Sequence, residues 1–297
     1  MQVKKAVFPV AGLGSRFLPA TKANPKEMLP VVDKPLIQYA VEEAVRAGIT
    51  HMIFITSSSK RAIEDHFDNH FELETRLREQ GKEKLLALVK SISPPGIQFS
   101  YVRQHQPLGL GHAILSAEHA IGDEPFAVLL ADDLIDDFNF PCLSAMANHF
   151  SQTGRSVLAV QPVPWQEIHQ YGVVKTVDDT RSFMRISDMI EKPSQENAPS
   201  NLAAVGRYIF TPEIFPCLKD TKIDHRGEIQ LTGGIQRLLG IEPVYAYRFG
   251  GKRYDCGSKL GYLLATVEFG MRHEEVGHAF RDFLHQANLT REFDECI

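Results

Sequence analysis

The chain has 297 residues, with 32 Lys and Arg against 37 Asp and Glu, a formal net charge of −5 and 43% hydrophobic residues. This length can bury a sizeable core, and the ordinary composition excludes an intrinsically disordered or collagen-like chain. The negative net charge argues against a whole surface that binds nucleic acid or an anionic membrane, but it is compatible with a local basic pocket.

The first 135 residues alternate short apolar strands with helical patterns. We expect strands at residues 6–10, 52–55, 97–102 and 126–130, and helices at residues 36–47, 60–67, 71–92 and 112–120. Apolar strands that are separated by helices are typical of a parallel sheet with helices on both faces.

After about residue 155 the connections between strands become shorter. Strands are expected at residues 157–160, 173–177 and 204–210, and two helices at residues 261–270 and 274–287. Because the sequence contains no repeat and no low-complexity linker, we predict a single α/β domain. Its sheet is expected to be Rossmann-like, mixed and mostly parallel, with helices at its sides.

A glycine-rich turn follows the first strand at residues 11–22. It is not a dinucleotide fingerprint, because Phe17 stands where the third glycine would be, and it does not match a P-loop. Between Gly12 and Pro35 the cations outnumber the acids, with Arg16, Lys22, Lys26 and Lys34 against Glu27 and Asp33. Backbone N–H groups beside spaced cations suit a polyphosphate ligand; a solvated surface loop is the alternative.

These residues resemble those of a known family. The segments that carry the resemblance are residues 12–22, 25–35, 103–113, 130–133, 171–174, 191–193, 205–208, 227–232 and 254–257. In this order they resemble the sugar-1-phosphate nucleotidylyltransferases, and most of all the bacterial UTP–glucose-1-phosphate uridylyltransferases, also called UDP-glucose pyrophosphorylases. The resemblance spans residues 5–272.

The resemblance implies a fold of the nucleotidyltransferase or glycosyltransferase-A type. Residues 1–135 would bind the nucleotide, residues 136–257 the sugar, and residues 258–297 would form C-terminal helices. The implied reaction is attack by glucose-1-phosphate on the α-phosphorus of UTP, which gives UDP-glucose and pyrophosphate. Because the attacking phosphate is already charged, no nucleophile–base pair of side chains is required.

The resemblance also implies a nucleotide site and its cations. The nucleotide-binding residues would be Ala11, Gly12, Gly14, Gln104 and Gly109, and the catalytic cations would be Arg16, Lys26 and Lys192. The Gln104 amide has both a donor and an acceptor for a uracil edge, with a neutral strand-end role as the alternative. We expect a structural role for His112.

Two carboxylates are candidate Mg²⁺ ligands. Asp132 ends the fourth apolar strand, at the edge where open α/β sheets bind ligands, and Mg²⁺ prefers one or two carboxylates with phosphate oxygens. The resemblance adds Asp255 as a second ligand, for which a helix N-cap is the alternative. Asp133 would point elsewhere on an extended backbone.

For the sugar, the resemblance implies contacts from Gly172, Glu191 and Gly206. Glu191 and Lys192 are neighbours, so both can reach one site only if the chain bends there, and Pro193 makes a bend credible. One position departs from the family, because Gly233-Gly234 stands where an acidic residue is expected. This leaves the roles of Gln230 and Thr232 open.

Two other functions compete with the uridylyltransferase. A thymidylyltransferase differs in its base by one methyl group, which is worth only about 1–3 kcal/mol of discrimination. A non-catalytic regulatory relative that binds sugar nucleotides is disfavoured because the cations and carboxylates are all present.

The remaining expectations concern partners and compartment. Scattered cysteines without a C-x-x-C pair predict a reducing, cytoplasmic compartment, and we expect neither a nucleic-acid nor a membrane partner. Apolar positions within residues 260–269 and 276–284 suit a homo-oligomer, a dimer or a tetramer, although core packing explains them equally well.

Overall fold

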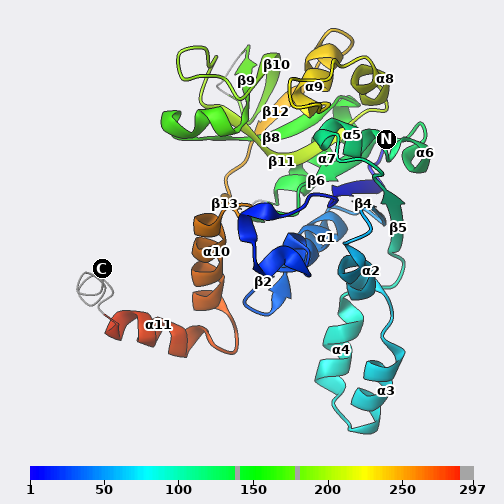
Figure 1. The fold of residues 1–297 in the computed structure, drawn as a ribbon, viewed down its shortest axis with the longest axis vertical. Helices are drawn as coiled ribbons and strands as arrows, with labels where there is room; N and C mark the ends of the chain where they lie inside the picture. The colour runs from blue at the N-terminus through cyan, green and yellow to red at the C-terminus, as the bar shows by residue number, and fades with distance from the viewer. Residues whose placement is uncertain (138–140, 178–180, 288–297) are drawn as a thin grey trace.

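The computed structural model describes residues 1–137, 141–177 and 181–287. The main strands are β1 (Lys5–Pro9), β4 (His51–Thr56), β5 (Gln98–Arg103), β6 (Phe126–Leu129), β8 (Val157–Pro162), β9 (Gly172–Thr176), β10 (Phe183–Glu191), β11 (Leu202–Phe210) and β12 (Tyr245–Arg248). They form one nine-stranded sheet in the order β5-β4-β1-β6-β11-β8-β12-β10-β9 (Figure 1). Two small sheets pair β2 (Pro30–Val31) with β3 (Lys34–Pro35), and β7 (Asp133–Asp136) with β13 (Lys252–Asp255).

Helices connect and cover these strands. They are α1 (Leu36–Arg46), α2 (Arg61–Phe67), α3 (Phe71–Glu79), α4 (Glu83–Ser91), α5 (Gly109–Leu115), α6 (Glu118–Ile121), α7 (Cys142–Thr153), α8 (Ile214–Lys219), α9 (Leu231–Leu239), α10 (Lys259–Arg272) and α11 (Gly277–Gln286). Short 3₁₀ turns are η1 (Ser15–Phe17), η2 (Ala20–Lys22), η3 (Lys26–Met28) and η4 (Trp165–Gln170).

The α/β architecture and the mixed sheet are confirmed, but a mostly parallel sheet describes only part of it. Strands β5, β4, β1 and β6 are parallel. In contrast, β11 is antiparallel to β6 and β8, and β10 is antiparallel to β12 and β9, whereas β8 and β12 pair in parallel. The physical reason is that parallel neighbours need long crossover connections, which the second half of the sheet largely lacks.

Each face of the sheet carries its own core. Val7 packs in one cluster and its neighbour Phe8 in the other, because successive side chains of a strand point to opposite faces. Helices α5, α8 and α9 contribute to the first cluster, and α1, α2 and α7 to the second.

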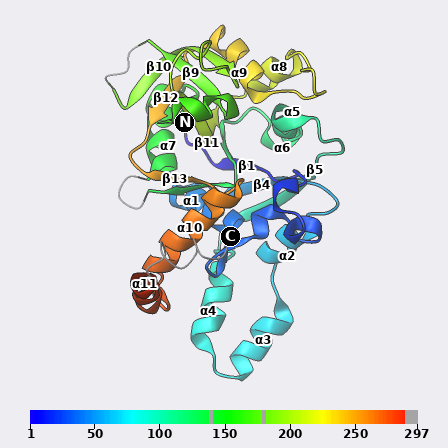
Figure 2. The same ribbon diagram turned by 60° about the vertical axis from the view of Figure 1, so that its left-hand side comes forward.

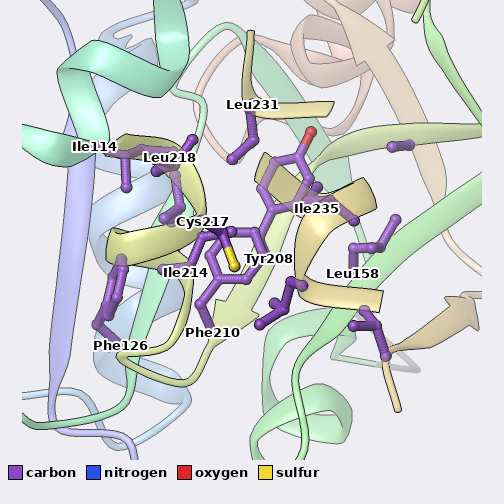
Figure 3. Close-up of a cluster of buried hydrophobic side chains, with 14 of the residues drawn as sticks. Ile114, Phe126, Leu158, Tyr208, Phe210, Ile214, Cys217, Leu218, Leu231 and Ile235 are labelled. Atoms are coloured by element: carbon purple, nitrogen blue, oxygen red, sulfur yellow. The ribbon is translucent and has the colours of Figure 1, made fainter. Parts of the chain in front are cut away.

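Figure 3 shows the first cluster at the place where β11 meets two helices. Tyr208 and Phe210 of β11 lie beside Ile214 and Leu218 of α8 and Ile235 of α9. The side chain of Tyr208 also lines the cavity described below. This core therefore holds β11 and α9 together beneath one wall of that cavity.

Two of the expected helices are each divided in the structure. The helix expected at residues 71–92 is the pair α3 and α4, which turns at Gly81 with φ +65° and projects from the body as an arm (Figure 1 and Figure 2). A positive φ favours glycine and ends a helix. The helix expected at residues 112–120 begins earlier, at Gly109, and is divided into α5 and α6.

The two expected C-terminal helices are present as α10 and α11, which lead away from the large sheet (Figure 2). Their exposed apolar side chains are Leu260, Leu263, Leu264 and Phe283, with Val276 just before α11. Every helix within the described ranges is too short or too polar to cross a bilayer. Cys142, Cys217 and Cys256 are buried free thiols, and Cys296 lies outside the described residues.

Candidate active site

All of the candidate site residues line one cavity of about 650 Å³. These residues are Ala11, Gly12, Gly14, Arg16, Lys26, Gln104, Gly109, Asp132, Gly172, Glu191, Lys192, Gly206 and Asp255. A second hollow of about 800 Å³ lies beside α2 and β5 and is lined by none of them. The larger volume does not make it the better site, because the glycine turn, the cations and the carboxylates meet only in the first cavity among the described residues.

The glycine turn is held open toward the cavity. Gly14 has φ +66°, and its carbonyl accepts a 2.7 Å hydrogen bond from the hydroxyl of Thr21. Apart from its neighbours in the chain, no heavy atom of the described residues lies within 4 Å of the place where a Cβ of Gly12 would stand. Arg16 reaches across to donate to the carbonyl of Gly257 at 3.4 Å. The backbone of the turn is therefore accessible to a ligand.

Lys26 and Asp132 form the ion pair at the centre of the site, with Nζ and Oδ2 2.5 Å apart. Burial lowers the pKa of Lys26, but Asp132 and Glu27 outweigh it, so its pKa is raised and its charge is kept at neutral pH. Burial likewise raises the pKa of Asp132, but the charge and hydrogen bond of Lys26 bring it below its ordinary value. Both groups are therefore charged under ordinary conditions.

A buried ion pair lies beneath Lys26. Glu27, the next residue of η3, accepts a 2.9 Å hydrogen bond from Lys60, and their side chains are 2% and 3% exposed. Burial raises the pKa of Glu27 even though Lys60 opposes this. The pair joins η3 to the start of α2, so it fixes the short turn that carries Lys26.

The two candidate metal ligands approach one point. A Cβ on Gly257 would lie 2.8 Å from Oδ2 of Asp132 and 3.0 Å from Oδ1 of Asp255. Oδ1 of Asp255 also accepts the N–H of Gly257 at 3.0 Å, whereas the cap of α10 is Ser258, so the N-cap alternative for Asp255 is wrong. Two hard carboxylates that approach one point of the cavity fit a magnesium ion. No cluster of three or more His, Cys, Asp or Glu suited to a metal occurs in the described ranges.

Asp133 lines the same cavity and is buried, but its carboxylate is paired with Arg253 rather than with Lys26. Its carboxylate accepts from Arg253, with 2.5 Å between Oδ1 and Nη2, and Arg253 also donates to the Tyr171 hydroxyl at 3.3 Å. Gly206 has φ +53°, and a Cβ there would overlap the Asp133 carboxylate. Gly206 is therefore required for the close approach of Asp133. No local pattern in the sequence marks Arg253 as a site residue, because its partner Asp133 is 120 positions away.

A second buried ion pair supports the strand end that carries Asp132. Arg207 of β11 donates to both carboxylate oxygens of Glu43 on α1, at 2.8–3.1 Å. Its guanidinium also donates to the carbonyls of Leu130 and Asp133 at 3.0 and 2.8 Å. Arg207 is 1% exposed. It thus fixes the backbone on either side of Asp132.

Gln104 lies at the end of β5, opposite the first turn of α5. Its amide Nε2 is 2.9 Å from Nδ1 of His112 and 3.3 Å from the carbonyl oxygen of Gly109. Gly109 has φ +92°, and a Cβ there would meet Glu228 and the Ile229 carbonyl at 2.8 and 3.0 Å. The glycine therefore makes room for residues 228–229 rather than only for a base.

On the opposite wall, Glu191 and Lys192 both line the cavity, and the expected bend between them is confirmed. Lys192 has φ +45°, and its Nζ lies 3.3 Å from Oε1 of Glu191. The other oxygen of Glu191 accepts a 2.5 Å hydrogen bond from Thr232. A Cβ on Gly172 would lie 3.4 Å from Glu191 and 2.7 Å from Met189, so this wall is closely packed.

The Gly233-Gly234 departure does not alter the cavity wall. Neither residue lines the cavity, and a Cβ on Gly234 would lie 2.5 Å from Leu218 of α8. A Cβ on Gly233 would lie 2.7 Å from Thr221. These glycines therefore let α9 pack closely on α8, while Thr232 just before them faces the site.

Residues 5–269 match the nucleotidyl transferase family, and the chain belongs to that family. It is 51% identical over 275 residues to the UTP–glucose-1-phosphate uridylyltransferase of Bacillus subtilis (strain 168). The aligned region covers 93% of this chain and 94% of that protein. The UTP-bound UGPase from Acinetobacter baumannii superposes with a TM-score of 0.90 at 44% identity, over 96% of this chain and 99% of that one.

A UDP-glucose pyrophosphorylase complexed with UDP-glucose gives a TM-score of 0.84 at 46% identity, over 91% of this chain and 100% of that one. The resemblance to the bacterial uridylyltransferases is thereby confirmed.

Proposed function

We propose that this protein transfers a uridylyl group from UTP to glucose-1-phosphate, giving UDP-glucose and pyrophosphate. The observation that carries the proposal is the Lys26–Asp132 contact of 2.5 Å, which brings the glycine turn and the carboxylate edge of the sheet into one cavity. The names of the relatives, at 44–51% identity over nearly the whole chain, support the choice of substrates.

The chemistry is an in-line displacement. A phosphate oxygen of glucose-1-phosphate forms a bond to the α-phosphorus of UTP, and the bond from that phosphorus to the bridging oxygen of the β-phosphate breaks, which releases pyrophosphate. The nucleophile is already anionic, so the protein need not remove a proton, and catalysis consists of positioning and charge neutralisation.

The turn side of the cavity, residues 11–28 and 104–109, is proposed to hold the nucleotide. Ala11, Gly12 and Gly14 would present backbone groups to the phosphates and the base. Arg16 offers a planar fork to a phosphate, and Lys26 a compact charge to the departing pyrophosphate. The raised pKa of Lys26 supports this role, because its ammonium stays charged.

The strand side, formed by β9, β10, β11 and α9, is proposed to hold the sugar phosphate. Glu191 would accept hydrogen bonds from sugar hydroxyls, and its contact with Thr232 fixes its orientation. Gly172 and Gly206 would leave room for the ring, and Lys192 would neutralise the sugar phosphate. In this proposal residues 1–135 and 136–257 serve as a nucleotide half and a sugar half of one domain.

Magnesium is the proposed cofactor, with Asp132 and Asp255 as its protein ligands. When bound, the ion would neutralise phosphate charge in the cavity. Lys26 would also balance the charge of Asp132, which it contacts through Oδ2.

The exposed apolar side chains of α10 and α11 support the proposal of a homo-oligomer. Light scattering would measure the number of its subunits.

The test is pyrophosphate release with UTP, dTTP, CTP, ATP and GTP, each paired with glucose-, galactose- and mannose-1-phosphate, with Mg²⁺ or with a chelator. We expect the highest kcat/KM for UTP with glucose-1-phosphate. In the presence of the chelator we expect no pyrophosphate release. A higher value for dTTP would make the protein a thymidylyltransferase. Failure of every pair to react would leave a sugar-nucleotide-binding regulatory relative.

A further inference from the structure

The side chain of Gln104 is held at its nitrogen end. Nε2 lies 3.3 Å from the carbonyl oxygen of Gly109 and 2.9 Å from Nδ1 of His112, and both residues belong to the first turn of α5. His112 is partly buried. An amide nitrogen carries two hydrogens, so these two contacts account for both of them.

The Gly109 carbonyl shows which way the amide points. A carbonyl oxygen can only accept, so the atom that faces it must be the nitrogen of Gln104. The second hydrogen of that nitrogen then goes to His112, whose Nδ1 accepts it, and the imidazole hydrogen is placed on Nε2. Among the described residues no donor contacts Oε1 of Gln104, which remains as the free acceptor of a side chain that lines the cavity.

The carbonyl of Gly109 is itself held in place. The segment at residues 228–229 packs against it, with the Ile229 N–H donating to the Leu108 carbonyl at 2.8 Å and the Gly111 N–H donating to the Ile229 carbonyl at 2.9 Å. A Cβ on Gly111 would lie 2.6 Å from the Ile229 carbonyl. Gln104 is therefore positioned by a rigid backbone on one side and by His112 on the other.

We propose that His112 is a positioning residue that makes Gln104 an acceptor toward the base and thereby selects uracil over cytosine. Uracil carries a hydrogen on ring atom N3, which an amide oxygen accepts. Cytosine has a lone pair at N3, and two acceptors that face each other are unfavourable. This inference rests on the proposed function, in which Gln104 contacts the base, and it replaces the expectation that both ends of the amide do so.

The same geometry explains which nucleotides are not separated here. Thymine carries the same N3 hydrogen as uracil, so His112 and Gln104 together give no discrimination between UTP and dTTP. UTP and dTTP differ at the C5 methyl group and at the 2′-hydroxyl of the ribose, so any preference between them must come from contacts at those two places. His112 thus acts on the choice between keto and amino pyrimidines.

The first experiment measures kcat/KM for UTP and for CTP, and the affinities of both nucleotides by calorimetry, in the wild type and four variants. His112→Ala should lower the UTP-to-CTP ratio by about tenfold or more, mainly by raising the KM for UTP. His112→Asn should keep the ratio within about threefold of the wild type, because its side-chain oxygen can accept near the place of Nδ1. His119→Ala, an exposed histidine on α6, is the matched control and should change nothing.

Equal losses with UTP and CTP in His112→Ala would overturn the proposal and leave His112 a structural residue. Gln104→Ala tests whether Gln104 contacts the base, separately from the role of His112. If it lowers the ratio and His112→Ala does not, only the role of His112 is wrong. If neither lowers the ratio, Gln104 does not contact the base, and the inference fails even though the wild type makes UDP-glucose.

A second measurement needs no variant. N3-methyl-UTP and 5-methyl-UTP each add one methyl group to uridine triphosphate, but only the first lacks the N3 hydrogen. We expect wild-type protein to bind N3-methyl-UTP at least tenfold more weakly than 5-methyl-UTP. Equal binding of the two would overturn the proposal even if His112→Ala failed to fold. The calorimetry also remains informative if the wild type releases no pyrophosphate, an outcome that concerns the proposed function alone.

Discussion

The turn side and the strand side of the cavity are built in opposite ways. On the turn side, the place of a Cβ on Gly12 has no neighbour within 4 Å, and Leu13 is 78% exposed. On the strand side, a Cβ on Gly172 would meet Met189 at 2.7 Å and Thr232 at 3.1 Å. The glycine turn therefore depends on a few anchors beneath an open backbone, whereas the strand side depends on close packing between elements distant in sequence.

The largest expected effect concerns the anchor of the turn side. Lys60→Met would leave the carboxylate of Glu27 buried without its partner, and removing one member of a buried ion pair costs about 3–5 kcal/mol. We expect urea denaturation to show a loss of this size in the free energy of unfolding. The double variant Glu27→Leu/Lys60→Met should recover much of it, because no charge then remains buried.

Arg76→Met is the matched control, since its ion pair with Glu72 on the arm is 68% exposed at both side chains. Exposed pairs contribute at most about 1 kcal/mol. A loss below that value in Lys60→Met would show that the turn is held by its backbone rather than by the ion pair.

The next effect concerns the cation that this anchor positions. Lys26→Ala should lower kcat by about 10²–10³, the scale of one preorganised contact that acts in the transition state. Lys22→Ala is the control, because Lys22 lies in the same turn but is exposed and does not line the cavity. A near-normal kcat in Lys26→Ala, or an equal loss in both variants, would remove Lys26 from the mechanism.

The two sides also differ in how much of them the sequence predicts. The glycine turn is local: its glycines and cations lie within residues 11–28, so a motif identifies them. Its anchor was missed, because Lys60 is 33 positions from Glu27 and nothing in the sequence pairs them. The parallel pairing of the strands in this half likewise follows from their alternation with helices.

The strand side was predicted by resemblance rather than by pattern. Glu191 and Thr232 are 41 positions apart, and Arg207 and Glu43 are 164 apart. The strand β10 and the helix α9 were not predicted at all; β10 lacks a continuous apolar run, and its pattern of buried and exposed residues is irregular. Contacts of this kind depend on the order of strands in the sheet, which periodicity does not determine.

A smaller effect is expected on the strand side. Thr232→Val keeps the shape of the side chain but removes the hydrogen bond to Glu191. We expect the KM for glucose-1-phosphate to rise about tenfold with a nearly unchanged kcat, because one hydrogen bond to a charged group is lost. Thr221→Val, whose hydroxyl bonds to the Cys217 carbonyl outside the cavity, is the control. A change in the KM for UTP instead would mean that Glu191 contacts UTP rather than glucose-1-phosphate.

The smallest effect concerns the loop that closes the strand side, where Asp224 holds residues 226–230. Its carboxylate accepts from the N–H groups of Glu228 and Arg226, at 2.9 and 2.8 Å, and from the amide of Gln230 at 2.9 Å. These hydrogen bonds, that of Glu228 first, lower the pKa of Asp224 to about 2. Because the pKa of Asp224 is lower in the folded state, its ionised carboxylate stabilises the folded loop above pH 3.8. This stabilisation is lost as the pH falls through about 2.

Carboxyl-detected NMR of labelled protein measures this directly. We expect Asp224 to titrate at about pH 2, and the amide of Glu228 to stay protected from exchange until the carboxylate is protonated. Gln230→Leu removes one donor, so the pKa of Asp224 should rise in that variant. Titration of Asp224 near 3.8 in the wild type would mean that this loop is open in solution, and the strand side would then share the openness of the turn side.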